Sequence, residues 1–304
     1  MPLLLTILLC VQCLTPPTAA PDQVGPPHPF TRIALIGASV TWGFGNSVDV
    51  PLETYIHHEP IDLADVIDAT LVHDHEIVVS GGDATFFRTP LAAGAEQADA
   101  AMAAKPTLVL ALDFLFWYGY GNRGIGAVPH TGVESRLALL ERGLQELDRF
   151  TCPVVIFDFP DMTPAIGIML HRSQVPTSTE LEALNKRLLA WAAERDNVTL
   201  LPLASTIDEI RTDEGFTIQE LQWPAGSLNT IILPDHLHPT TDGTIAISQL
   251  ALRTLDDRTE SIEPIDYRRD PQVIRSRLEQ AEFEEARDAG MAVKIEAPAA
   301  PDGD

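Results

Sequence analysis

Five short apolar runs recur along the chain and are separated by longer segments of mixed polarity. Continuous apolarity, rather than alternation of apolar and polar residues, is typical of strands that are covered on both faces of a parallel sheet. The pattern therefore predicts five buried strands. They are Ile33–Ile36, Ile77–Val79, Leu108–Leu112, Val154–Phe157 and Val198–Leu201.

The intervening segments predict amphipathic helices, because their apolar residues recur at helical spacing. Pro60 suits the first turn of a helix that carries Ile61, Ala64, Ile67 and Leu71. Two further helices begin with a capping box, in which a Thr side chain and a Glu side chain satisfy each other's backbone amides. These pairs are Thr131 with Glu134 and Thr177 with Glu180.

Strands that alternate with helices predict an α/β fold. We expect a three-layer α/β/α sandwich with a mainly parallel five-stranded sheet, flavodoxin-like in arrangement, over residues 28–256. In such sheets the reactive groups lie on loops beyond the carboxyl ends of the strands. Residues 257–304 predict a polar extension with a helix over Pro271–Asp288 and a disordered tail from Ala297.

The first twenty residues predict a secretory signal peptide. An apolar run from Leu3 to about Leu14 is too short to span a bilayer, and small residues follow it at Thr18–Ala20. An N-terminal apolar tail is the alternative. Removal of residues 1–20 would leave Cys152 as the last cysteine, so no intramolecular disulfide is expected. The sequence thus predicts a secreted or periplasmic protein without stable membrane insertion.

Charge argues against one class of partner. Twenty Lys and Arg against 44 Asp and Glu leave a formal net charge of −24 in 304 residues. Such a surface repels polyphosphates, so nucleic-acid binding is not expected. A neutral small molecule or a glycan ester remains compatible with this charge.

The loop after the first predicted strand contains a candidate nucleophile. It runs from Gly37 to Gly45 and places Ser39 directly beyond the buried strand. A serine there presents its hydroxyl and its backbone N–H to the same space, which suits nucleophilic attack with one oxyanion donor. The alternative is a serine that only caps a helix.

The second candidate segment is Pro234–Pro239, far away in the sequence. Asp235 and His238 are three residues apart, so the carboxylate can orient the imidazole and stabilise the imidazolium that forms when Ser39 loses its proton. The alternatives are a polar surface turn or a metal site formed by Asp235, His236 and His238. With no nearby cysteine and no helical histidine pair, we predict neither a metal nor a cofactor.

These two segments resemble the first and last conserved blocks of the SGNH (GDSL-type) hydrolases. The first has Gly37-Ala38-Ser39 followed by Thr41, Gly43 and Gly45, with Ala38 where the family usually has Asp. The last has Asp235, His238, Pro239 and Gly243. The resemblance implies an ester hydrolase with Ser39 as nucleophile, His238 as general base and Asp235 as the residue that orients it.

The same resemblance implies an oxyanion hole in which the Ser39 N–H is joined by that of Gly82, in the segment Ser80–Thr85. A turn that needs glycine for a positive φ is the alternative explanation of Gly82. The third block departs from the family pattern, because Asp113 stands where an Asn usually donates its amide. An ionised Asp113 cannot donate, and loss of such a donor typically costs about 3 kcal/mol. Two features could offset this loss: burial could keep Asp113 protonated, or Asn122 could supply the amide.

Two function hypotheses follow. The first is a serine esterase that cleaves carboxylic esters, such as acetyl or other acyl esters on a carbohydrate or lipid; acyl transfer to another acceptor would use the same three residues. The second, motivated by Asp113, is a non-catalytic SGNH-like binding module. The sequence makes no prediction of oligomeric state.

Overall fold

A computed structural model describes residues 30–121, 132–218, 221–258 and 266–292. The predicted signal peptide, Thr131, Asn122 and the predicted disordered tail lie outside the described residues.

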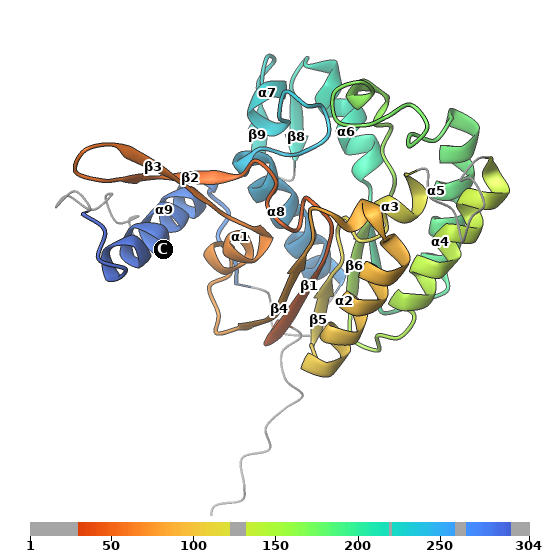
Figure 1. Ribbon diagram of the computed structural model, residues 1–304, viewed down its shortest axis with the longest axis horizontal. Coiled ribbons are helices and arrows are strands. Elements are labelled where there is room, and N and C mark those ends of the chain that lie inside the picture. Colours follow the sequence, from red (N-terminus) through yellow and green to blue (C-terminus); the bar gives the residue numbers. More distant parts are fainter. Residues whose placement is uncertain (1–29, 122–131, 219–220, 259–265, 293–304) are drawn as a thin grey trace, which may run out of the picture.

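The central sheet has five strands, all parallel to their neighbours, in the order β4-β1-β5-β6-β7 (Figure 1). This arrangement confirms the predicted α/β class with a five-stranded parallel sheet. The chain runs from β1 to one edge and then returns past β1 to the other side, so β1 lies beside a topological switch point. The strands are β1 (Arg32–Gly37), β4 (Glu76–Gly82), β5 (Leu108–Leu110), β6 (Val154–Phe157) and β7 (Val198–Leu201).

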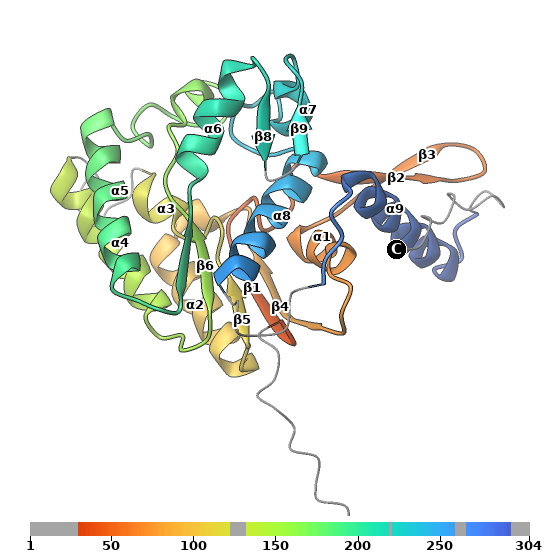
Figure 2. The same ribbon diagram turned by 180° about the vertical axis from the view of Figure 1, so that it is seen from behind.

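Helices cover both faces of the sheet, which explains why its strands are apolar throughout. Ala34 and Ile36 of β1 face α2 (Pro90–Ala104), α4 (Val133–Leu147) and α5 (Ser178–Ala193). Ile33 and Leu35 point to the opposite face, which α1 (Leu63–Thr70) and α8 (Thr241–Arg258) cover (Figures 1 and 2). All four of these β1 side chains are fully buried.

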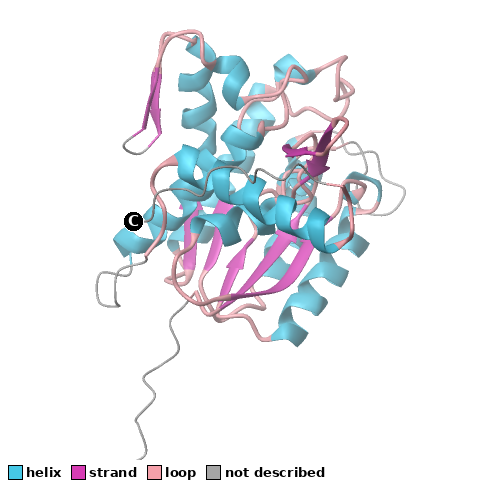
Figure 3. Cartoon of the chain, turned by 90° about the vertical axis from the view of Figure 1, so that its left-hand side faces the viewer, coloured by secondary structure: helices cyan, strands magenta, loops and turns pink. Residues whose placement is uncertain are grey.

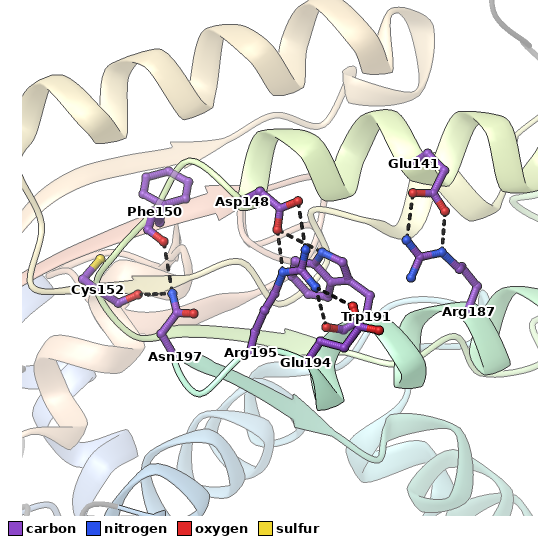
Figure 4. Close-up of polar contacts among 9 residues, drawn as sticks. All are labelled: Glu141, Asp148, Phe150, Cys152, Arg187, Trp191, Glu194, Arg195 and Asn197. Carbon is purple, nitrogen blue, oxygen red and sulfur yellow. Dashed lines mark hydrogen bonds and ion pairs between the residues drawn. The ribbon is translucent and has the colours of Figure 1, made fainter.

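Two ion pairs tie the outer helices α4 and α5 to each other (Figure 4). Arg187 makes two bonds to the carboxylate of Glu141, and Arg195 makes two to that of Asp148. Asp148 also accepts from the indole N–H of Trp191, and the Arg195 guanidinium lies 4.6 Å from the centre of the Trp191 ring. This cluster holds the Trp191 ring against the core.

Cys152 precedes β6 and is a free, half-buried thiol. Its carbonyl accepts from the Asn197 amide, which also donates to the carbonyl of Phe150 and so links the starts of β6 and β7 (Figure 4). Burial raises the pKa of the Cys152 thiol, which keeps it protonated at neutral pH. These contacts fit a packing role.

Several elements were not predicted. Two antiparallel hairpins lie outside the main sheet, and short helices crowd the rim above its carboxyl edge (Figures 1 and 3). They are β2 (Ser47–Pro51) with β3 (Ile56–Pro60), β8 (Phe216–Ile218) with β9 (Leu221–Trp223), α3 (Phe116–Gly119), α6 (Leu203–Thr212), α7 (Leu228–Ile231) and the 3-10 turns η1 (Phe86–Arg88) and η2 (Thr163–Ala165).

The prediction for Pro60 was wrong. Pro60 ends β3, and the helix begins only at Leu63, behind the N-cap residue Asp62. Asp62 forms a capping box with Asp65, so a carboxylate pair caps this helix in place of the proline.

The two predicted capping boxes had different outcomes. Thr177 and Glu180 form the expected box at the start of α5. Helix α4 instead follows Gly132 and has no side-chain cap of its own, while the Gly132 N–H donates to the Glu180 carboxylate at 2.9 Å. One glutamate therefore serves the beginnings of two helices.

Helix α9 spans Pro271–Asp288, as the sequence predicts. It packs against β2, α1 and α8, and its buried Ile274 and Leu278 join Val48 and Val66 in one apolar cluster (Figures 1 and 2). In the described part of the chain, no helix has the length and apolarity that a membrane span requires.

The packing of α9 predicts a pH dependence of stability. Burial, with nearby acidic groups such as Asp65 adding repulsion, raises the pKa of Glu282 to about 7 from 4.5. A carboxyl group whose pKa is raised in the folded state stabilises the fold when protonated, and that stabilisation is lost as the pH rises from 4.5 through 7. Glu282→Gln should therefore raise the melting temperature at pH 8, with a smaller gain at pH 5.

Thermal denaturation of both proteins across this pH range measures the effect. Glu284→Gln, at an exposed position of the same helix, is the matched control and should show no such trend. Equal curves for Glu282→Gln and wild type at every pH would contradict the raised pKa of Glu282.

Candidate active site

Ser39 lies in a tight turn just beyond the carboxyl end of β1. The turn is closed by backbone bonds in which Trp42 donates to Ala38 and Phe44 donates to Ser39. Among the described residues, the Ser39 N–H donates to no acceptor. The turn thus leaves both the hydroxyl and the amide of Ser39 available beside the sheet edge.

Asp113, which follows β5, holds this turn in place. Its Oδ1 accepts from the Ala38 N–H at 3.0 Å and from the Thr41 hydroxyl at 2.6 Å, and its Oδ2 accepts from the Val40 N–H at 2.8 Å. Burial raises the pKa of Asp113, and these donors oppose that shift. An added Cβ at Gly37 would lie 2.1 Å from Asp113 Oδ1, so only glycine admits the carboxylate.

The second segment forms a turn that Asp235 stabilises. Its Oδ1 accepts from the N–H groups of Leu237 and His238, and His236 adopts a left-handed φ of 59° to complete the turn. The Leu233 N–H donates to the His238 carbonyl. The Asp235 carboxylate therefore stabilises the backbone of this turn in addition to its contact with the imidazole.

The structure brings Ser39, His238 and Asp235 together. His238 Nδ1 lies 2.7 Å from Asp235 Oδ2, and His238 Nε2 lies 2.9 Å from Ser39 Oγ. A neutral imidazole that donates from Nδ1 to the carboxylate accepts the serine proton at Nε2. Burial acts to raise the pKa of Asp235, but bonds from the backbone and imidazole of His238 hold it below its usual value.

Two hydrogen bonds join the distant segments that carry Ser39 and His238. The buried Asn46 amide donates to the Thr244 hydroxyl at 2.8 Å, and the Thr241 hydroxyl donates to the Ser47 carbonyl. Both threonines belong to α8, which begins directly after the His238 turn. The Ser39 loop and the His238 turn are consequently held in fixed positions relative to each other.

Phe44 packs flat against the imidazole. The ring centroids of Phe44 and His238 are 4.2 Å apart and their planes meet at 26°. Phe44 belongs to the same turn as Ser39, so one loop positions both the Ser39 hydroxyl and a ring that covers one face of His238. Sequence reasoning did not identify this contact, because no local pattern relates the two rings.

The predicted oxyanion residues have different surroundings. Gly82 pairs in register with Gly37 and has no positive φ; it is required because a Cβ there would lie 2.4 Å from the Trp42 N. This close approach places β4 beside the Ser39 turn. Asp113 acts as an acceptor, so its contacts disfavour a donor role. Asn122 lies outside the described residues.

An apolar cavity of about 90 Å³ opens beside Ser39 and His238. Its walls come from the loops after β5 and β6 and from α6, β8 and α7. They include Leu115, Phe116, Phe159, Met162, Ile207, Ile210, Ile218, Ile231 and Leu237.

The residues that the structure describes include no group of three or more His, Cys, Asp or Glu arranged to hold a metal ion. Asp235 and His238, which were considered as ligands, bond to each other.

Comparisons with known proteins add a distant similarity. No protein-family model matches the sequence, and no curated protein matches it either. Among solved structures, the chain is similar to a diltiazem-metabolizing enzyme of a gut microbe, with 14% sequence identity and a TM-score of 0.45. The similarity covers 73% of this chain and 46% of that one, so the chain spans less than half the length of that enzyme.

The contacts of Asp113 predict the effect of the residue that the SGNH family usually has there. In Asp113→Asn, the amide NH2 must face the N–H of either Ala38 or Val40, which leaves that donor unpaired. We expect a loss of about 1–3 kcal/mol in the free energy of unfolding, measured by urea denaturation.

Asp158→Asn is the matched control, because Asp158 lines the same cavity and its Oδ1 accepts from the Ala204 N–H, which an amide oxygen can also accept. An Asp113→Asn protein as stable as wild type would show that Asp113 does not brace the turn.

Proposed function

We propose that the chain is a serine esterase of the SGNH type. The observation that carries the proposal is the continuous chain of hydrogen bonds from Asp235 through His238 to Ser39. The sequence blocks support it, as does the place of Ser39 at the carboxyl end of β1, beside the switch point of the sheet.

In the first step, Ser39 Oγ attacks the ester carbonyl carbon while His238 Nε2 takes the hydroxyl proton. Asp235 stabilises the imidazolium that forms. The carbonyl oxygen becomes an oxyanion, and the N–H groups of Ser39 and Gly82 donate to it. When the intermediate collapses, His238 returns the proton to the departing alcohol, which leaves an acyl ester on Ser39.

In the second step, a water molecule attacks the acyl carbon while His238 takes one of its protons. Collapse of this intermediate breaks the bond to Ser39 Oγ, which regains a proton from His238, and the carboxylic acid departs. An alcohol that replaces the water would make the same chain an acyltransferase. Export from the cytoplasm, which rests on the apolar N-terminal run, is part of this proposal.

Asp113 favours one competing function. The described residues that line the cavity include no asparagine to supply the family's third oxyanion donor. A site with fewer donors stabilises the oxyanion less, which would suit a protein that binds an ester without cleaving it.

Replacement of the nucleophile separates the two functions. Ser39→Ala should lower the rate of p-nitrophenyl acetate hydrolysis at least about a thousandfold, because no hydroxyl remains to form the acyl ester. Ser205→Ala, at an exposed serine of α6, is the matched control and should hydrolyse the ester at the wild-type rate.

Labelling by a fluorophosphonate probe, located by mass spectrometry, should modify Ser39 stoichiometrically in wild type. An undiminished rate in Ser39→Ala would refute Ser39 as the nucleophile, and an unlabelled Ser39 in a folded protein would support the binding module.

The Phe44 ring predicts a specific kinetic effect. An aromatic face beside the imidazole stabilises its positive charge, so Phe44→Leu should lower kcat/KM about threefold to thirtyfold. The acidic limb of the pH–rate profile should move to lower pH, because leucine excludes water equally but lacks the aromatic face. Phe44→Tyr should preserve both properties. A Leu variant with an unchanged pH profile would reduce Phe44 to a packing role.

A further inference from the structure

The wall of the cavity beside Ser39 offers almost no free polar groups. The Asp158 carboxylate accepts from the Ala204 N–H at 2.6 Å, and the Thr206 hydroxyl donates to the Pro202 carbonyl. Asp113 is engaged by the nucleophile turn. A sugar ring placed here would lose hydrogen bonds to water without gaining replacements.

The wall opposite the sheet edge is built by branched aliphatic side chains. Ile207 and Ile210 come from α6, Ile218 from β8 and Ile231 from α7. Each is less than 9% exposed, and all four belong to one apolar cluster. Figure 1 shows these elements grouped above the carboxyl edge of the sheet.

We propose that this cavity binds a short, uncharged aliphatic chain of the ester substrate, next to the carbonyl that Ser39 attacks. The inference rests on the proposed esterase function and narrows it to aliphatic esters, away from acetyl groups on a carbohydrate. Ser39 and His238 themselves line the cavity, so a chain attached to the reacting carbonyl enters it directly.

The size of the cavity limits the chain. The cavity volume of about 90 Å³ is several times the space that one water molecule needs, so the cavity admits more than the methyl group of an acetate. A chain that is too long meets the isoleucine wall. We therefore expect an optimum between acetate and octanoate.

Two series of esters test the proposal and show which side of the ester enters. The first is p-nitrophenyl esters from acetate to octanoate, and the second is acetate esters of alcohols from methanol to hexanol. In one series, kcat/KM should rise about fourfold for each methylene, the value for burial of one CH2 group, and then fall once the cavity is full.

A pair of variants tests whether the isoleucine wall sets the preferred chain length of the ester. Ile210→Ala shortens a side chain that lines the cavity and should move the optimum to a chain one to three carbons longer. Ile274→Ala makes the same change at a fully buried isoleucine of α9, outside the cavity, and should leave the optimum unchanged even if it lowers stability. Acetate hydrolysis by each variant reports that the protein is folded.

The outcomes separate the two proposals. A protein that hydrolyses acetate but shows no gain with chain length in either series refutes the aliphatic pocket and leaves the esterase intact. The same conclusion follows if Ile210→Ala and Ile274→Ala give identical profiles. A folded protein inactive on every ester, with Ser39 unlabelled by fluorophosphonate, overturns both.

Discussion

The hydrogen bonds between Asp113 and the turn after β1 determine the shape of the site. A buried carboxylate is costly unless its oxygens are bonded, and here Ala38, Val40 and Thr41 supply the donors. These bonds pull the turn against the end of β5, and Gly37 admits the close approach. Because Ala38 and Val40 point their amides at Asp113, the Ser39 amide between them is left free.

The second requirement is that the segments carrying Ser39 and His238, which are far apart in the sequence, keep fixed positions relative to each other. The helix α8 follows the His238 turn and is hydrogen-bonded to the segment that follows Ser39, through Asn46 and Thr244. The imidazole is then confined from three sides, by the Asp235 carboxylate, the Ser39 hydroxyl and the Phe44 ring. Rotation of the imidazole would break these contacts, so they hold the ring in one orientation, as the proposed role of His238 requires.

The contacts of Asp113 explain why a carboxylate suits the position where the SGNH family usually has Asn. An Asn can donate to an oxyanion, whereas a carboxylate can accept from several amides of one turn. In this chain Asp113 braces the Ser39 turn, and the backbone amides of Ser39 and Gly82 are the proposed oxyanion donors. The neighbouring cavity wall is mostly apolar, and apolar surroundings would strengthen hydrogen bonds to the proposed oxyanion.

The sequence by itself determined whatever depends on neighbours along the chain. Apolar runs predicted the five strands, the spacing of Thr177 and Glu180 predicted their capping box, and an Arg/Glu-rich segment predicted helix α9 over Pro271–Asp288. The prediction failed at Pro60, because β3 pairs with β2 and Pro60 is the last residue of β3.

Only the tertiary structure decided the partners of Asp113, the stacking of Phe44 on His238 and the isoleucine wall. Each joins residues far apart in the sequence, and side-chain chemistry states what a group can bond to but not which group the packing of the sheet and helices will bring to it.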